Sequence, residues 1–178
     1  MDFTYNWFSA LIPKLRTHLG GLMGQPGVHV LEVGSFEGRS AVWFLGQLAC
    51  GEGSSLTCID PWIPTVEFTS DEVTMAERHF DSNLTRAQAT SRGTLHKLKG
   101  RSFNILPTLK PETYDVIYID GSHRAFDVLC DMVLAWRILK PGGMLICDDY
   151  DLEDHCSSVG VPHLAIDGFL ACCGECDR

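Results

Sequence analysis

Three aspartates follow two apolar segments in the second half of the chain. Asp120 ends the run YDVIYID, and Asp148 and Asp149 end the run MLICDD. If these runs are neighbouring strands of one sheet, the three carboxylates converge at one edge. Carboxylates so close raise one another's pKa values, and a hard divalent cation such as Mg²⁺, which prefers oxygen ligands, relieves the conflict. The pattern predicts a Mg²⁺ site; the alternative is three unrelated acids that face solvent in loops or at helix starts.

A histidine follows the first of these acids closely. His123 lies three residues beyond Asp120, where a helix is expected to begin. An imidazole beside a hydroxyl can accept its proton near neutral pH. We therefore expect His123 and Asp120 to be the catalytic residues. The alternative is a first-turn helix residue without chemistry, and the other six histidines have no comparable context.

A glycine-rich turn follows an apolar run in the first third of the chain. The segment is LEVGSFEGRS, with glycines at 34 and 38. Gly34 permits a tight turn and a close approach of the backbone, and Ser40 stands where a helix N-terminus favours an anionic group. The spacing is GxxxG and differs from the dinucleotide pattern GxGxxG. An ordinary connection between a strand and a helix remains an alternative.

An acid follows this turn at the distance expected for a ribose-binding residue. Asp60, in the segment CIDPW, lies 22 residues after Gly38. A carboxylate at the end of a second strand is placed to bind ribose hydroxyls in nucleotide-binding folds. The alternative is an aspartate that forms a turn before Pro61. The glycine turn and Asp60 together favour a nucleotide-like cofactor more strongly than either does alone.

Alternating strands and helices are needed to position these residues. Short apolar runs predict five strands, and amphipathic stretches predict helices between them. Such alternation predicts an α/β fold: a Rossmann-like, doubly wound, mostly parallel sheet with helices on both faces. Ligands of such folds bind beyond the carboxyl ends of the strands. The expected strands are 29–34, 55–60, 94–99, 115–120 and 144–148, and the expected helices are 7–23, 40–48, 71–90, 102–109, 124–139 and 161–173.

Composition limits the partners. The chain has 178 residues, a length that fits a single domain 1–178: an N-terminal helical segment 1–27, a cofactor-binding core 28–150 and a helical tail 151–178. The net charge of −9 disfavours nucleic acid, and no apolar run is long enough for a membrane span. No signal peptide is recognised, so a cytoplasmic protein is expected.

The chain has eight cysteines, which we expect to be mostly reduced and structural. Cys58 and Cys147 lie in apolar strands, where a free thiol packs as a small hydrophobe. The tail holds Cys172, Cys173 and Cys176, and the last two form a CxxC. One such pair is weak evidence for zinc without a second pair.

Taken together, the motifs resemble a known family. The segments LEVGSFEGRS, CIDPW, KGRSFNILPTL, YDVIYIDGSH and LKPGGMLICDDY occur in the order found in class I S-adenosylmethionine-dependent methyltransferases. The resemblance covers residues 28–150. Within the class it is greatest to the metal-dependent O-methyltransferases, both the catechol and caffeoyl-CoA type and the macrocin O-methyltransferase and cephalosporin hydroxylase-like type.

The resemblance implies roles for particular residues. Glu32, Gly34 and Ser40 would contact the methionine part of S-adenosylmethionine, Asp60 the ribose and Ser102 the adenine. His123 stands where the catechol type has a catalytic lysine, and a histidine after DGS resembles the antibiotic-pathway type. The implied metal ligands are Asp120, Asp148 and Asp149. The full expected cofactor-binding set is Glu32, Gly34, Ser35, Phe36, Gly38, Ser40, Asp60, Pro61, Trp62, Ser102 and Asp120.

The chain departs from the family at its C-terminal side, where two further strands are expected and are apparently missing. Our leading interpretation is methylation of a small-molecule hydroxyl, assisted by Mg²⁺ or another divalent cation. A non-catalytic cofactor-binding module that acts through association, such as a homo-oligomer, is one alternative, and a nicotinamide-dependent oxidoreductase is another. Phe3, Tyr5, Trp7 and Phe8 are interpreted as core or dimer-contact residues more readily than as a cover for the acceptor. Trp62 could flank the adenine or fill the core.

Overall fold

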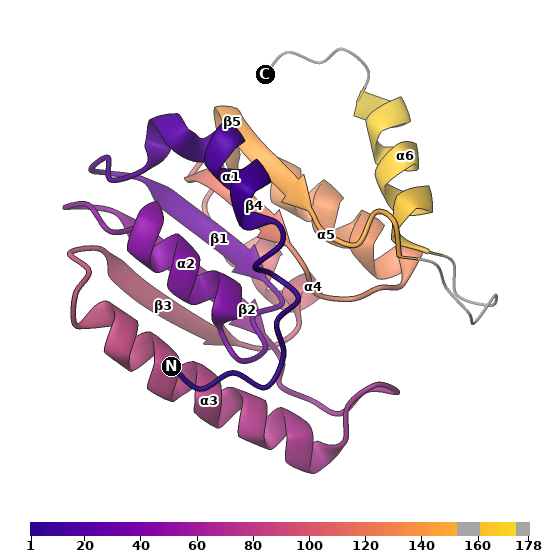
Figure 1. Ribbon diagram of the computed structural model, residues 1–178. Coiled ribbons are helices and arrows are strands. Elements are labelled where there is room, and N and C mark those ends of the chain that lie inside the picture. Colours follow the sequence, from indigo (N-terminus) through magenta and orange to yellow (C-terminus); the bar gives the residue numbers. More distant parts are fainter. Residues whose placement is uncertain (153–160, 174–178) are drawn as a thin grey trace.

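A five-stranded parallel sheet forms the centre of the protein (Figure 1). The structure is a computed structural model that describes residues 1–152 and 161–173. The strands lie in the order β3-β2-β1-β4-β5, and every neighbouring pair is parallel. The expected Rossmann-like fold is therefore confirmed. The strands are β1 (His29–Val33), β2 (Ser55–Asp60), β3 (Thr94–Lys99), β4 (Tyr114–Ile119) and β5 (Leu139–Cys147).

Helices cover both faces of this sheet (Figure 1). Successive residues of a strand point to opposite faces, so Val30 and Leu31 of β1 enter two separate apolar cores. The first core lies under α1 (Ile12–Leu19), α2 (Arg39–Gln47) and α3 (Ser70–Gln88). The second lies under α4 (Ser102–Ile105), α5 (Ala125–Ile138) and α6 (Pro162–Cys173). Two short 3₁₀ turns, η1 (Gly20–Leu22) and η2 (Leu106–Thr108), follow α1 and α4.

Two sequence-based boundaries were wrong. The first helix begins at Ile12 rather than at residue 7, because residues 2–7 are held in a non-helical path by polar contacts with Glu37 of the β1–α2 loop, Arg39 of α2 and Asn83 of α3. The last strand begins at Leu139 and includes the Pro-Gly-Gly segment, which we had assigned to a turn. Its pairing with β4 shifts register between Tyr114 and Val116, so the extra residues are accommodated as a bulge.

The helix expected at 161–173 is confirmed as α6, which packs on α5. The rings of Trp136 and Phe169 meet there at 5.7 Å. In the part of the chain that the structure describes, no strand lies beyond β5. None of the described helices has the length and apolar character of a membrane span. Cys176 lies outside the described residues.

Candidate functional site

The loop between β1 and α2 makes a close approach to the end of β4. Gly34 has φ +86°, and a Cβ atom there would lie 1.9 Å from the carbonyl oxygen of Asp120. Gly38 caps α2 with φ +79°, and a Cβ atom there would lie 2.4 Å from Leu84. Position 34 therefore requires glycine, because backbone atoms fill the space, and the positive φ at position 38 favours glycine. The predicted tight turn is present, and Gly34 also brings the ends of two strands together.

Asp60, at the end of β2, is bound to this loop. One carboxylate oxygen accepts the amide hydrogens of Ser35 and Phe36, each at 2.9 Å. The other accepts the amide hydrogen of Trp62 at 2.7 Å. Burial raises the pKa of Asp60, and these three hydrogen bonds oppose that shift. The three amides use three of the roughly four lone-pair sites of the carboxylate, so only the oxygen that binds Trp62 retains capacity, and binding of a ribose hydroxyl there stays a prediction.

Phe36, in the middle of this loop, is held mainly through its backbone. It has φ 43°, in the left-handed region that favours glycine. Its amide is held by Asp60, and its carbonyl oxygen accepts the indole N–H of Trp62 at 2.9 Å. Trp62, which follows Pro61, is buried and packs against Phe80. The position of Trp62 is that of a core residue, and its contact with a cofactor stays a prediction.

Glu32 is a fully buried carboxylate directly beneath the loop. The hydroxyl of Ser35 donates to its Oε2 at 2.5 Å, whereas its Oε1 has no hydrogen-bond partner among the described residues. Burial raises the pKa of Glu32 to about 7, although the side chains of Ser35, Ser40 and Cys58 oppose the shift. A buried polar atom without a partner is costly in a folded protein. This oxygen is therefore a position where a bound ligand could donate a hydrogen bond.

The predicted acidic edge is present at the ends of β4 and β5. The amide of Asp120 donates to Val33 of β1, and the amide of Asp148 donates to Ile119 of β4, so both acids continue the sheet. The hydroxyl of Tyr118 lies between them, 3.2 Å from Asp120 and in hydrogen-bond contact with Asp148. The pKa of Asp120 is raised well above its ordinary value. Burial is the largest cause, and the negative charges of Asp148 and Asp149 add to it.

His123 lies between two further carboxylates. Its Nε2 is 3.2 Å from Asp149, and its Nδ1 is 3.2 Å from Glu67, in the loop after β2. The hydrogen bond to Asp149 raises the pKa of His123 to about 9 against the opposing effect of partial burial, and Glu67 adds to the rise. With both partners in place, the imidazole is protonated at neutral pH. Asp149 thus faces His123, while Asp120 and Asp148 face Tyr118.

The side chains of the acidic edge are not grouped as they would be around a bound metal ion. Within residues 1–152 and 161–173, no three His, Cys, Asp or Glu side chains are grouped closely enough to hold a metal ion. The chemistry of the donors, three carboxylates at adjacent strand ends, nevertheless suits a hard cation. The assignment of Asp120, Asp148 and Asp149 as metal ligands stays a prediction.

Ser102 begins α4 at the end of β3, and its hydroxyl interacts with Asp131 of α5. Burial raises the pKa of Asp131 to about 6, although Ser102 opposes the shift. Contact between Ser102 and an adenine stays a prediction.

Sequence reasoning missed Tyr118, Glu67 and Asp131. Tyr118 precedes Asp120 by two residues, a spacing that in an extended strand places both side chains on the same face and could have identified it. Glu67 lies in a loop, where no periodicity gives such a signal.

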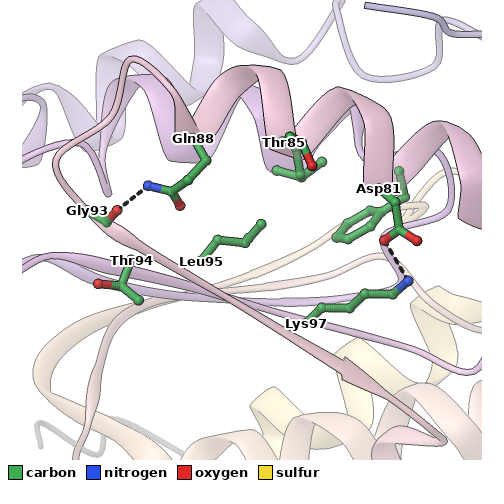
Figure 2. A pocket seen from close by; sticks show the side chains of 9 residues that line it. Asp81, Thr85, Gln88, Gly93, Thr94, Leu95 and Lys97 are labelled. Atoms are coloured by element: carbon green, nitrogen blue, oxygen red, sulfur yellow. Dashed lines mark hydrogen bonds and ion pairs between the residues drawn. The ribbon is translucent and has the colours of Figure 1, made fainter.

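A groove of about 550 Å³ lies elsewhere, between α3 and the edge strand β3. Figure 2 shows Lys97 paired with Asp81 at one end, and Gln88 bound to the carbonyl of Gly93 at the other. None of the residues that line it belongs to the acidic edge or to the glycine loop. We therefore separate this groove from the candidate site.

A comparison with protein-family models identifies residues 31–150 as a methyltransferase domain. The chain belongs to this family of methyltransferase domains. The matched residues include the glycine loop, Asp60 and the acidic edge, so the expected methyltransferase family is confirmed.

Individual methyltransferases match the chain in sequence or in fold. The chain is 31% identical over 120 residues to the O-methyltransferase hkm8 of Aspergillus hancockii, a match that covers 67% of this chain and 42% of that protein. The chain therefore spans less than half of this relative's length. An O-methyltransferase from Bacillus cereus in complex with SAH matches with a TM-score of 0.65 and 18% identity, over 96% of this chain and 71% of that one.

The methyltransferase MycE of the mycinamycin biosynthetic pathway, in complex with Mg, SAH and mycinamycin VI, also matches. Its TM-score is 0.59 with 13% identity, over 93% of this chain and 41% of that one. At these identities both structures support the fold alone.

Proposed function

We propose that this methyltransferase domain binds S-adenosylmethionine and transfers its methyl group to a hydroxyl of a small molecule. The observation that carries the proposal is the Glu32 carboxylate, which is fully buried and has an oxygen without a hydrogen-bond partner among the described residues. An ammonium group donates hydrogen bonds and carries positive charge. The methionine ammonium of the cofactor would therefore supply a donor for the unpartnered oxygen of Glu32 and a countercharge for its carboxylate. The O-methyltransferase relative supports the hydroxyl as acceptor.

The residues around Glu32 suit the rest of the cofactor. Gly34 lets the loop approach the end of β4 and Gly38 lets it approach α3, and Ser40 lies buried at the start of α2. Asp60 holds the loop through two of its amides with one oxygen, and its other oxygen, which accepts the amide of Trp62, keeps a lone pair for a ribose hydroxyl. The cofactor, when bound, supplies a methyl group on a positively charged sulfur.

His123 is proposed as the proton acceptor. If the bound cofactor gave its methyl group to an acceptor hydroxyl, the hydroxyl proton would have to move to a base, and His123 would take it. Asp149 orients the imidazole through Nε2, but a protonated imidazole cannot act as a base. His123 can therefore accept a proton only when Asp149 or Glu67 no longer contacts it, because its pKa is then lower.

Asp120, Asp148 and Asp149 are proposed to hold a divalent cation, for which Mg²⁺ is the first choice. The support is the chemistry of the donors and the proximity of Asp120 to Asp148 across the Tyr118 hydroxyl. A cation of this kind, when bound, offsets the carboxylate charges and makes an acceptor hydroxyl more acidic. Engagement of Asp149 there would also free His123 from one of its partners.

Calorimetry with S-adenosylhomocysteine, with and without Mg²⁺, tests the proposal. We expect micromolar binding by the wild type, no binding of NADH and a loss of at least tenfold in affinity for Glu32→Ala. Asp148→Asn should keep S-adenosylhomocysteine affinity but lose the heat of Mg²⁺ binding, and Asp81→Asn in the remote groove serves as the control. Methyl transfer to vicinal diols is then followed by mass spectrometry.

No binding of S-adenosylhomocysteine by the wild type would overturn the proposed function. Binding without transfer to any diol would instead favour the non-catalytic module. Unchanged Mg²⁺ binding by Asp148→Asn would overturn the assigned cation site and leave the cofactor site standing.

A further inference from the structure

A second groove, of about 410 Å³, lies where the N-terminal segment passes beside α2 and the end of α3 (Figure 1). Much of its lining is apolar and includes Phe3, Phe8, Ile12 and Val42. Its volume is within the range of small-molecule sites. Glu32, Asp60 and the acidic edge are not among the residues that line it, so this groove is separate from the candidate site. We call it the N-terminal groove.

The indole of Trp43, on α2, lines the N-terminal groove and has a donor without a partner. Its Nε1 is buried and makes no hydrogen bond with the described residues. The ring is held edge-on by two phenylalanines, with centroids 5.8 Å from Phe8 and 5.2 Å from Phe44. A buried N–H without an acceptor is rare in folded proteins and costs stability. This nitrogen is therefore a position for the acceptor atom of a ligand.

Arg39 lines the same groove, one helical turn before Trp43. Residues four apart lie on the same side of a helix, so the two side chains are neighbours. The Nε of Arg39 donates to the carbonyl oxygen of Tyr5 at 2.7 Å, and its guanidinium carbon lies 4.4 Å from the centroid of the Phe3 ring. Within residues 1–152 and 161–173, Arg39 forms no ion pair, and its two terminal nitrogens donate no hydrogen bond. The guanidinium thus keeps a positive charge and several donors for a ligand.

We propose that the N-terminal groove binds a monocarboxylate with an apolar body, of the size of a medium-chain fatty acid. The carboxylate accepts hydrogen bonds from Trp43 Nε1 and from the terminal nitrogens of Arg39, and the body lies against the apolar lining. Arg39 is the only charged side chain among the described residues of the groove, so it balances one negative charge. A phosphate, with nearly two charges, is matched less well in a chain of net charge −9. Met1, on the groove and half exposed, is a flexible side chain that can move as the ligand enters.

The test compares octanoate with octan-1-ol, which has the same chain without the charge, by calorimetry. We expect the wild type to bind octanoate at least about tenfold more tightly than octan-1-ol, because only octanoate pairs with the guanidinium. Arg39→Gln should lose this preference by weakening the binding of octanoate alone. Trp43→Phe keeps an aromatic ring but removes the N–H, and it should weaken octanoate binding about tenfold.

Nuclear magnetic resonance of the wild type locates the ligand without relying on a variant's affinity. The chain has four tryptophans, and the indole N–H signal that is absent from Trp43→Phe belongs to Trp43. This signal should move downfield with octanoate, as expected for a new hydrogen bond to a carboxylate, and should move less with octan-1-ol. The other three indole signals should change little.

Arg86→Gln is the matched control. Arg86 also holds the N-terminal segment, through Asp2 at 3.2 Å, but it does not line the groove, so its variant should bind octanoate as the wild type does. Equal affinity of Arg39→Gln and wild type for octanoate would overturn the inference, and so would an unmoved Trp43 signal or no binding of octanoate by the wild type. Displacement of octanoate by S-adenosylhomocysteine would also overturn it, because the carboxylate would then belong to the cofactor site.

Discussion

The carboxylate of Asp60 accepts the backbone amide hydrogen of Phe36 at 2.9 Å, so the end of β2 fixes the loop that follows β1. The same oxygen holds the amide of Ser35. The shape of the loop between β1 and α2 therefore depends on a side chain from the neighbouring strand.

Replacement of Asp60 by alanine should release this loop. Three backbone amides lose an acceptor that is largely buried, and we expect a loss of about 3 kcal/mol in unfolding free energy. Affinity for S-adenosylhomocysteine should fall at least tenfold, as measured by calorimetry. Asp115→Ala is the matched control, because Asp115 also accepts a backbone amide, from His29, but at the opposite end of the sheet. It should lower stability and leave the affinity unchanged; an equal loss of affinity in both variants would contradict the role of Asp60.

Replacement of Gly34 by alanine adds a single methyl group but should destabilise the protein strongly. The new methyl group would meet the carbonyl oxygen of Asp120 at 1.9 Å, in a conformation with φ +86°. We expect a loss of about 3 kcal/mol or more, because neither backbone can move without breaking strand pairing. Gly46→Ala, inside α2 with no atom within 4 Å, should instead gain up to about 1 kcal/mol. Urea denaturation of the two variants checks the prediction, and a tolerated Gly34→Ala would contradict the close approach.

The pKa of Glu32 predicts a pH dependence of stability. It is about 7 in the folded protein against 4.5 ordinarily, so between these values the folded state holds a proton that the unfolded chain has released. Stability should therefore fall as the pH rises through this window. Glu32→Gln removes the effect, and relative to wild type it should gain up to about 3 kcal/mol between about pH 4 and about pH 8.

Urea denaturation of wild type and Glu32→Gln at about pH 4 and about pH 8 measures the change in unfolding free energy. Glu72→Gln is a control whose stability difference from wild type should depend on pH with the opposite sign. Hydrogen bonds from Thr69 lower the pKa of Glu72, so its contribution is present at high pH and lost as the pH falls. A stability difference between Glu32→Gln and wild type that did not vary with pH would contradict the buried carboxylate.

Tyr118→Phe should weaken the acidic edge. The variant loses the hydroxyl that donates between Asp120 and Asp148, and we expect a cost of about 2 kcal/mol. Tyr114→Phe is the control, since the Tyr114 hydroxyl donates to the neutral Thr57, and its cost should be nearer to about 1 kcal/mol. Thermal unfolding with and without Mg²⁺ gives both values. If the proposed cation site is right, Mg²⁺ reduces the cost for Tyr118→Phe alone; a cost unaffected by Mg²⁺ counts against that site.

The sequence was sufficient to predict which acids stand at strand ends, because apolar runs mark where each strand stops. Asp60, Asp120 and Asp148 were identified as strand-end residues from apolar runs alone, and the structure confirms those positions. The partners of His123 could not be predicted in the same way. Glu67 reaches it from a loop whose path depends on tertiary contacts, and no periodicity marks such a residue.

The boundaries of the elements were less predictable for a related reason. Pro141 and the two glycines after it are typical of a turn, yet pairing with β4 outweighs that local preference and absorbs them into a bulged strand. Residues 7–11 have a helical pattern, but contacts of the preceding segment with Glu37 and Asn83 delay the start of α1. In both places long-range contacts decide the outcome.

The central position of β1 has a consequence for how the chain folds. One edge of β1 pairs with β2, which follows soon in sequence. The other edge pairs with β4, where Val30 lies opposite Val116, a residue far later in the chain. During synthesis on the ribosome, one edge of β1 therefore stays open until two further strands and three helices have emerged. Such high contact order slows folding and leaves an apolar strand available to wrong partners. We expect chaperone dependence to be greatest while this central pairing is incomplete.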